Sequence, residues 1–160
     1  MSALHDSLTT DDKGRVFFRG SRYLLVRPET LVAVQRALAE TFGAGAAECL
    51  VAGGRAGGGA AIRTLGGRGR EVVEGLLAMG RVIGWGDFAL ERLEPDVLVV
   101  TVRHSPFAEA HGPAAGPVCH LTPGVLEQLA DGVLGRPTRV VERSCAAAGA
   151  DVCRFEARVR

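Results

Sequence analysis

Residues 140–155 read VVERSCAAAGADVCRF, a stretch in which two β-rich runs are joined by a short loop that contains glycine. Runs of β-branched and aromatic residues on either side of such a loop predict a β-hairpin. Cys145 and Cys153 are separated by seven residues, so this hairpin brings their thiols together, and Glu142 lies three residues before Cys145. The chain is therefore predicted to close with a hairpin that carries two thiols and a carboxylate.

Two more hairpins and four helices are predicted before this one. The other β-rich runs pair around turn residues and are Arg15–Phe18 with Tyr23–Val26, and Phe88–Leu93 with Val97–Val102. Apolar residues at helical spacing predict helices over 28–42, 43–65, 71–82 and 118–134. Because the strands come in hairpin pairs, we predict an α+β fold in which a largely antiparallel β-sheet packs against helices.

The remaining segments set the domain boundaries. Residues 1–13 are polar and are predicted to be a flexible N-terminal tail. Residues 14–160 then form a single domain, since 160 residues is the size of one ordinary domain. Residues 104–117 are predicted to be a loop.

Composition excludes several classes of function. Hydrophobic residues make up 47% of the chain, enough to build a core, and the formal net charge is +1, so no global field attracts nucleic acid. The N-terminus does not resemble a signal peptide, and no apolar run approaches the length of a membrane span. We therefore expect a cytoplasmic protein with no nucleic-acid partner, in which cysteines are reduced thiols or metal ligands.

Common catalytic and nucleotide-binding motifs do not fit the chain. The sequence has no P-loop, and Gly43–Gly45 follows a helix rather than the strand that a dinucleotide fingerprint requires. His104 is adjacent to Ser105, but sequence neighbours rarely form a working catalytic dyad. With no redox-cofactor motif and no acid–base pair, we predict no catalytic residues.

Cys119, Glu142, Cys145 and Cys153 form a candidate metal site. Three thiolates and one carboxylate supply the four ligands of a closed tetrahedral site, which is structural because no position remains for water. Thiolates favour zinc over magnesium or calcium. The residues also have ordinary interpretations: the cysteines are often plain core residues or, in an exported protein, a disulfide, and Glu142 is equally suited to an exposed strand position. The spacing matches no common zinc-finger pattern.

Residues 105–155 resemble the 4-vinyl reductase domain, the family that also forms the sensor part of aromatic-responsive transcription activators. The resemblance rests on SPFAEAH from Ser105, PVCH from Pro117, and the spacing E-x-x-C-x7-C from Glu142. It implies that Cys119, Glu142, Cys145 and Cys153 are zinc ligands. It also implies a fold similar to subunits of the Golgi transport-tethering complex and to haem-based nitric oxide sensors, with an apolar ligand cavity between sheet and helices, and a homodimer.

The chain departs from the phenol-sensing branch of that family. Those relatives hold phenol with a tryptophan on the strand before the S-F motif and a histidine in an earlier helix, and neither is present at the matching positions. The candidate cavity residues are apolar, with one candidate polar contact, His111. The apolar set is Leu77, Trp85, Phe88, Val102 and Phe107.

The leading functional hypothesis is a stand-alone binding domain for a neutral, hydrophobic small molecule, acting as a sensor or carrier. Burial of an unpaired charge in such a cavity is costly, which favours a neutral ligand. A stand-alone sensor must pass its state to a downstream protein partner. Two alternatives stay open, an accessory protein of tetrapyrrole vinyl reduction and a protein-interaction module. A face of alanine and glycine on the second helix suits close packing and adds to the expectation of a homodimer.

Overall fold

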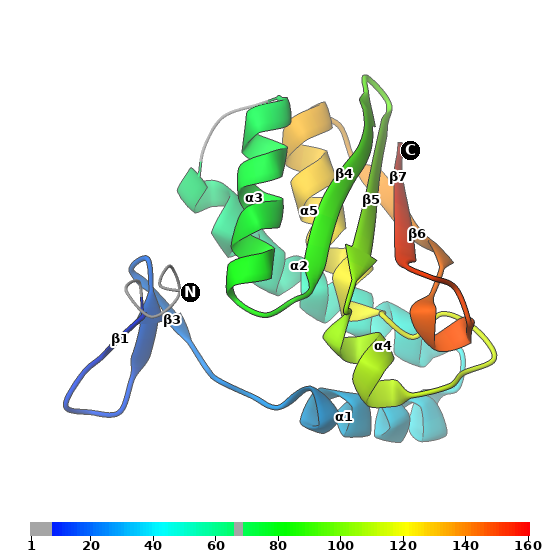
Figure 1. Cartoon of the computed structure of the whole chain (residues 1–160), viewed down its shortest axis with the longest axis horizontal. Coiled ribbons are helices and arrows are strands. Elements are labelled where there is room, and N and C mark those ends of the chain that lie inside the picture. The colour runs from blue at the N-terminus through cyan, green and yellow to red at the C-terminus, as the bar shows by residue number, and fades with distance from the viewer. Residues whose placement is uncertain (1–7, 66–68) are drawn as a thin grey trace.

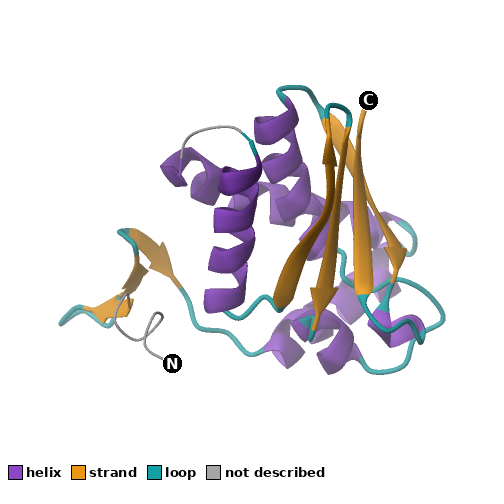
Figure 2. Ribbon diagram, turned by 45° about the horizontal axis from the view of Figure 1, so that its top comes forward, coloured by secondary structure: helices purple, strands orange, loops and turns teal. Residues whose placement is uncertain are grey.

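The computed structural model describes residues 8–65 and 69–160, and it shows an antiparallel sheet covered by helices (Figure 1 and Figure 2). The four strands of the main sheet lie in the order β4-β5-β7-β6, and every neighbouring pair is antiparallel. Their bounds are Asp87–Glu94 for β4, Val97–Arg103 for β5, Thr138–Ser144 for β6 and Cys153–Val159 for β7. The predicted α+β class and the two hairpins of this sheet are confirmed.

The helices and the remaining short elements fill the rest of the described chain. The α-helices are α1 Pro28–Phe42, α2 Gly45–Leu65, α3 Arg70–Val82, α4 Pro106–His111 and α5 Leu121–Leu134. A 3-10 turn, η1, spans Ala146–Ala148 in the last hairpin. A second sheet holds β1 Leu8–Thr10, β2 Val16–Phe18 and β3 Ser21–Tyr23.

The central strand β5 is buried on both of its faces. Leu98, Val100 and Val102 belong to the core beneath the helices, whereas Val97 and Val99 point to the opposite side, as alternation along a strand requires. On that opposite side Arg154 donates to Glu91 at 2.8 Å, one of several arginine–glutamate pairs. Charged side chains therefore cover the second face of the sheet where no helix does.

One layer of helices packs on the sheet, and another helix packs on that layer. α3 contacts β4, and α5 contacts β6 and β7. α2 lies across α5, and α1 runs beside α4 at the end of the sheet (Figure 1). The hydrophobic core consequently lies between the sheet and the pair α3 and α5.

α2 and α5 approach so closely that their backbones touch. A Cβ atom on Gly54 would clash with the Leu121 carbonyl oxygen, and one on Gly124 would clash with the Val51 carbonyl oxygen. A Cβ atom on Gly58 would lie 2.9 Å from Val125 Cα. The glycines of α2, which lower helix propensity, are thus required where the two helices cross.

A buried carboxylate joins these two helices to the sheet. Glu127 of α5 is 1% exposed, forms an ion pair with Arg55 of α2, and accepts a hydrogen bond of 3.0 Å from the backbone N–H of Val140 in β6. Each partner satisfies the charge that burial would otherwise leave unpaired.

Two local predictions are wrong and have clear physical causes. Residues 104–117 are not all loop, because the Ser105 hydroxyl accepts from the Ala108 N–H and so caps the short helix α4. The last helix begins at Leu121 and not at Val118, since His120 is its N-cap residue. Cys119 therefore precedes α5 and does not lie within it.

The N-terminal sheet is set apart from the main sheet (Figure 1). Its predicted hairpin is confirmed, but the second strand ends at Tyr23, and Leu24–Val26 have no partner strand and form an exposed linker to α1. Leu8–Thr10, within the stretch predicted to be a tail, pairs with β2, while residues 1–7 lie outside the described residues.

In the described part of the chain, none of the helices combines the length and the apolar character needed to cross a bilayer.

The crossing of α2 and α5 gives a first prediction. We expect Gly54→Ala to lower the free energy of unfolding by about 1–3 kcal/mol, because the added methyl meets backbone that cannot move aside. Gly57→Ala is the control: nothing lies within 4 Å of its Cβ position, so helix propensity should make it neutral or stabilising by up to about 1 kcal/mol. Urea unfolding measures both, and equal effects would contradict this packing.

Candidate functional site

The four predicted metal ligands come together at one end of the main sheet. Cys119 precedes α5, Glu142 lies in β6, Cys145 follows β6, and Cys153 opens β7. One ligand atom from each residue lies within 4.8 Å of every other, and the three cysteines are free thiols. The Sγ atom of Cys119 is 3.7 Å from that of Cys153 and 4.0 Å from that of Cys145.

The cluster is buried and partly satisfied by hydrogen bonds. All three cysteines are at most 1% exposed. The Ala146 N–H donates to Cys153 Sγ at 3.3 Å, and the Cys119 N–H donates to Glu142 Oε2 at 3.1 Å. Glu142 Oε1 is buried and has no hydrogen-bond partner among the described residues. A bound cation would supply the partner that this oxygen does not find among the described residues, so the four residues could bind a metal ion.

The thiols differ in acidity because they share protons. The hydrogen bond between the Cys119 and Cys153 sulfur atoms lowers the pKa of Cys153 to about 7. The same hydrogen bond, together with burial, raises the pKa of Cys119 well above its usual range. Burial raises the pKa of Cys145 to about 11. Cys153 is therefore the most acidic of the three thiols, and a metal ion that bound the cluster would displace the protons of the others.

The cluster also connects segments that are distant in the sequence. The Ser105 hydroxyl, which caps α4, lies 3.2 Å from Cys119 Sγ. Ala147 of η1 accepts a 2.8 Å hydrogen bond from the Ala114 N–H. The cluster thus fixes the start of α5 against the β6–β7 hairpin, and α4 against both. The Ser105 hydroxyl therefore belongs to this end of the fold, whereas the ring of its neighbour His104 bonds to Glu109.

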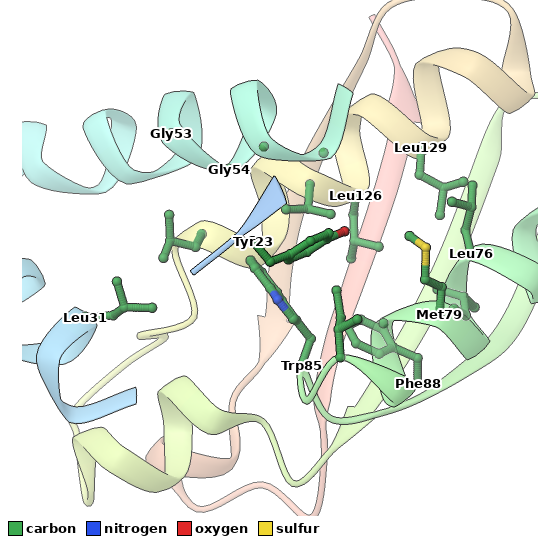
Figure 3. Close-up of a pocket in the computed structure, with 17 residues that line it drawn as sticks. Tyr23, Leu31, Gly53, Gly54, Leu76, Met79, Trp85, Phe88, Leu126 and Leu129 are labelled. Carbon is green, nitrogen blue, oxygen red and sulfur yellow. The ribbon is translucent and has the colours of Figure 1, made fainter. Parts of the chain in front are cut away.

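A second candidate site is a cavity of about 360 Å³ lined mainly by α2, α3, α5 and the start of β4 (Figure 3). Its wall is apolar, and at the glycine positions the wall is formed by main-chain atoms. The lining residues are Tyr23, Leu31, Gly53, Gly54, Gly57, Gly58, Leu76, Leu77, Met79, Gly80, Ile83, Trp85, Phe88, Leu121, Val125, Leu126 and Leu129.

Local backbone geometry directs Trp85 into this cavity. Gly84 and Gly86 have φ angles of 88° and 114°, a region that L side chains rarely adopt, and a Cβ on Gly86 would lie 2.7 Å from Val102 Cγ1. The glycines on either side turn the indole inward, where it packs edge-on against Phe107 with ring centroids 5.3 Å apart.

The predicted cavity residues divide into three groups. Leu77, Trp85 and Phe88 line the cavity. Phe107 lines, together with Trp85, a neighbouring cavity of about 290 Å³ beside the N-terminal sheet. Val102 and His111 line neither cavity, because Val102 packs against Gly86 and the His111 ring lies 3.3 Å from the Gly112 carbonyl oxygen.

Sequence reasoning missed the wall residues of α5 and Tyr23. The α5 residues Leu121, Val125 and Leu129 recur at helical spacing, which predicts burial but does not separate cavity from core. Tyr23 reaches the cavity through the placement of the N-terminal sheet, for which the sequence holds no local signal.

Comparisons with known proteins agree with this architecture. Residues 98–159 match the family model of the 4-vinyl reductase domain, which confirms the resemblance to that family over this stretch. No curated protein matches the chain. The phenol-responsive sensory domain of the transcription activator PoxR, solved with phenol, is 19% identical with a TM-score of 0.83, and the match covers 99% of this chain and 87% of that one.

Two further solved structures share the fold. A vinyl-4-reductase family protein from Methanocaldococcus jannaschii is 15% identical with a TM-score of 0.60, over 85% of this chain and 82% of that one. A trafficking protein particle complex subunit 3 from Naegleria fowleri, covalently bound to palmitic acid, is 12% identical with a TM-score of 0.59, over 83% and 95%. The expected likeness to transport-complex subunits is thereby confirmed at the level of fold.

The cysteine cluster gives a second prediction. Cys153→Ser removes one of four donors, so we expect it to abolish the metal content and to lower the free energy of unfolding by about 3 kcal/mol or more, roughly 6–12 °C in Tm. Cys49→Ser is the matched control, because Cys49 is exposed and lies outside the cluster. Elemental analysis and thermal unfolding measure the two effects. Equal behaviour of the two variants, or no transition metal in the wild type prepared without chelators, would contradict the metal site.

Proposed function

We propose that the chain is a binding domain for a neutral, hydrophobic small molecule and that it acts as a sensor or carrier. The cavity between α2, α3 and α5 is the observation that carries this proposal. Its volume of about 360 Å³ falls in the range of small-molecule sites, roughly 300–1,000 Å³. A folded domain normally fills such a space with side chains, so a preserved apolar cavity favours a ligand.

The chemistry of the wall favours a ligand without charge. None of the described residues that line the cavity has an ionisable carboxylate, amine, guanidinium or imidazole. An ionised ligand would lose its hydration without gaining a partner charge, which is very costly. An apolar ligand instead gains about 25 cal/mol for each Å² removed from water. The likeness to a sensory domain solved with phenol supports the same class of ligand.

We further propose that the cysteine cluster is a structural zinc site with Cys119, Glu142, Cys145 and Cys153 as ligands. A tetrahedral zinc ion with zinc–sulfur bonds of about 2.3 Å sets its sulfur ligands about 3.8 Å apart, close to the separations of 3.7 and 4.0 Å in the structure. The unpartnered oxygen of Glu142 supplies the fourth donor. When bound, zinc would contribute structural stability, and the protein ligands would leave no position for a reactive water.

A homodimer is also proposed, on a different surface from the one that the sequence suggested. The small residues of α2 are engaged by α5 of the same chain. Five of the six large apolar side chains that are exposed in the described part of the chain instead lie between Leu24 and Phe42. Such a concentration of exposed apolar surface is typical of an interface, and a second copy of the chain is the partner that family habit favours.

The ligand proposal predicts a charge-specific effect on the cavity wall. Met79 is half-buried and lines the cavity. We expect Met79→Glu to weaken the binding of neutral aromatics such as 2-naphthol more than tenfold, because the carboxylate loses water without a partner. Met79→Gln, which has the same length and no charge, should retain most of the affinity. Titration by fluorescence measures both. Wild-type protein that binds only anionic compounds would contradict the proposed function.

The dimer proposal predicts the effect of charge on the exposed apolar segment. At micromolar concentration, wild type should sediment as a dimer, and the double variant Leu24→Glu, Phe42→Glu as a monomer, since both side chains are more than half exposed in one chain. Val141→Glu is the control, because Val141 is exposed on β6, away from the segment. A wild type that sediments as a monomer contradicts this proposal.

A further inference from the structure

One residue of the cavity wall comes from the N-terminal sheet, whereas the others come from the rest of the domain. Of its 17 lining residues, 16 lie between Leu31 and Leu129, and the remaining one is Tyr23 of β3. Figure 3 shows the Tyr23 ring entering the cavity, with its hydroxyl directed toward Met79 and Leu76. The N-terminal sheet thus completes a site that is otherwise built by the main domain.

Tyr23 also dominates the polar chemistry of the cavity. Among the described side chains that line the cavity, only the Tyr23 hydroxyl and the Trp85 indole carry an oxygen or nitrogen atom. Indole N–H can only donate a hydrogen bond, whereas a phenolic hydroxyl can donate and accept. Neither group has a hydrogen-bond partner among the described residues. A ligand with one hydroxyl or carbonyl group therefore finds its most versatile partner at Tyr23.

Aromatic contacts hold Tyr23 in this position. The Tyr23 ring packs edge-on against Phe18 of β2, with centroids 5.8 Å apart, and Phe18 is 2% exposed. The strands of the N-terminal sheet pair only with one another in the described chain, and the linker of Leu24–Val26 is exposed. The position of the sheet consequently depends on side chains such as Phe18 and Tyr23 that meet the main domain around the two cavities.

We propose that Tyr23 is the residue that selects ligands with a hydrogen-bonding group, and that ligand binding thereby fixes the N-terminal sheet on the cavity. This inference rests on the proposed function of the cavity. A hydroxyl that leaves water for an apolar site must find a new partner, and the Tyr23 hydroxyl provides it. A bound ligand in turn offers the Tyr23 hydroxyl a hydrogen bond that none of the described residues makes with it, so the ligand and the sheet stabilise each other.

The test compares two neutral probes of nearly equal shape, 2-naphthol and 2-methylnaphthalene. For full-length wild type, 2-naphthol should bind more tightly. Tyr23→Phe keeps the ring against Phe18 and removes only the hydroxyl, so it should weaken 2-naphthol binding about tenfold, the change expected from one lost hydrogen bond. The same variant should leave 2-methylnaphthalene binding unchanged within about twofold. Amide hydrogen exchange of β2 and β3 in wild type should slow more with 2-naphthol than with 2-methylnaphthalene.

The outcomes separate this inference from the function on which it rests. If wild type binds neither probe, the proposed function fails and the role of Tyr23 fails with it. If wild type binds both probes but Tyr23→Phe changes both affinities equally, or neither, only the role of Tyr23 is overturned. Equal protection of β2 and β3 by the two probes overturns the coupling to the sheet, and this measurement needs no variant.

Discussion

The contact between the backbones of α2 and α5 is the constraint on which the cavity depends. Gly54, Gly58 and Gly124 allow the helices to meet without side chains between them. The same glycine-rich helix gives the cavity part of its wall, because Gly53 and Gly57 leave space where larger residues would fill it. Each helical glycine costs roughly 1 kcal/mol of helix propensity relative to alanine. The glycines of α2 therefore lower the stability of this helix, and in return they allow the close approach of α5 and leave room for the cavity.

The two candidate sites are linked through α5, because the cysteine cluster lies just before its first turn and the cavity is lined by residues of its first turns. The cysteine cluster fixes the chain immediately before α5, and the next turns of α5 supply Leu121, Val125 and Leu129 to the cavity. Glu127 in the middle of α5 links this helix to Arg55 of α2 and to β6. A metal at the cluster would therefore stabilise the helix that forms the cavity, without any contact between metal and ligand.

Sequence patterns predicted what depends on local chemistry. The strands of the main sheet, four of the helices and the grouping of Cys119 with the final hairpin follow from periodicity, turns and a family motif, whereas these signals do not predict β1. The failures concern tertiary placement. Helix α4 depends on a single cap at Ser105, and Val102, although apolar, faces Gly86 and not the cavity. Nothing in the residues around Tyr23 shows that a separate sheet brings it to the cavity, because that contact joins segments that are far apart in the sequence.

The central claim is that α2, α3 and α5 border an apolar cavity that can take a neutral ligand. Xenon tests it directly, since this atom enters apolar cavities whatever their natural ligand. A crystal structure determined under xenon pressure should show xenon between Gly57, Met79 and Leu129, with the helices in place. Ordered water throughout the space, or helices collapsed so that no xenon enters, would contradict the account.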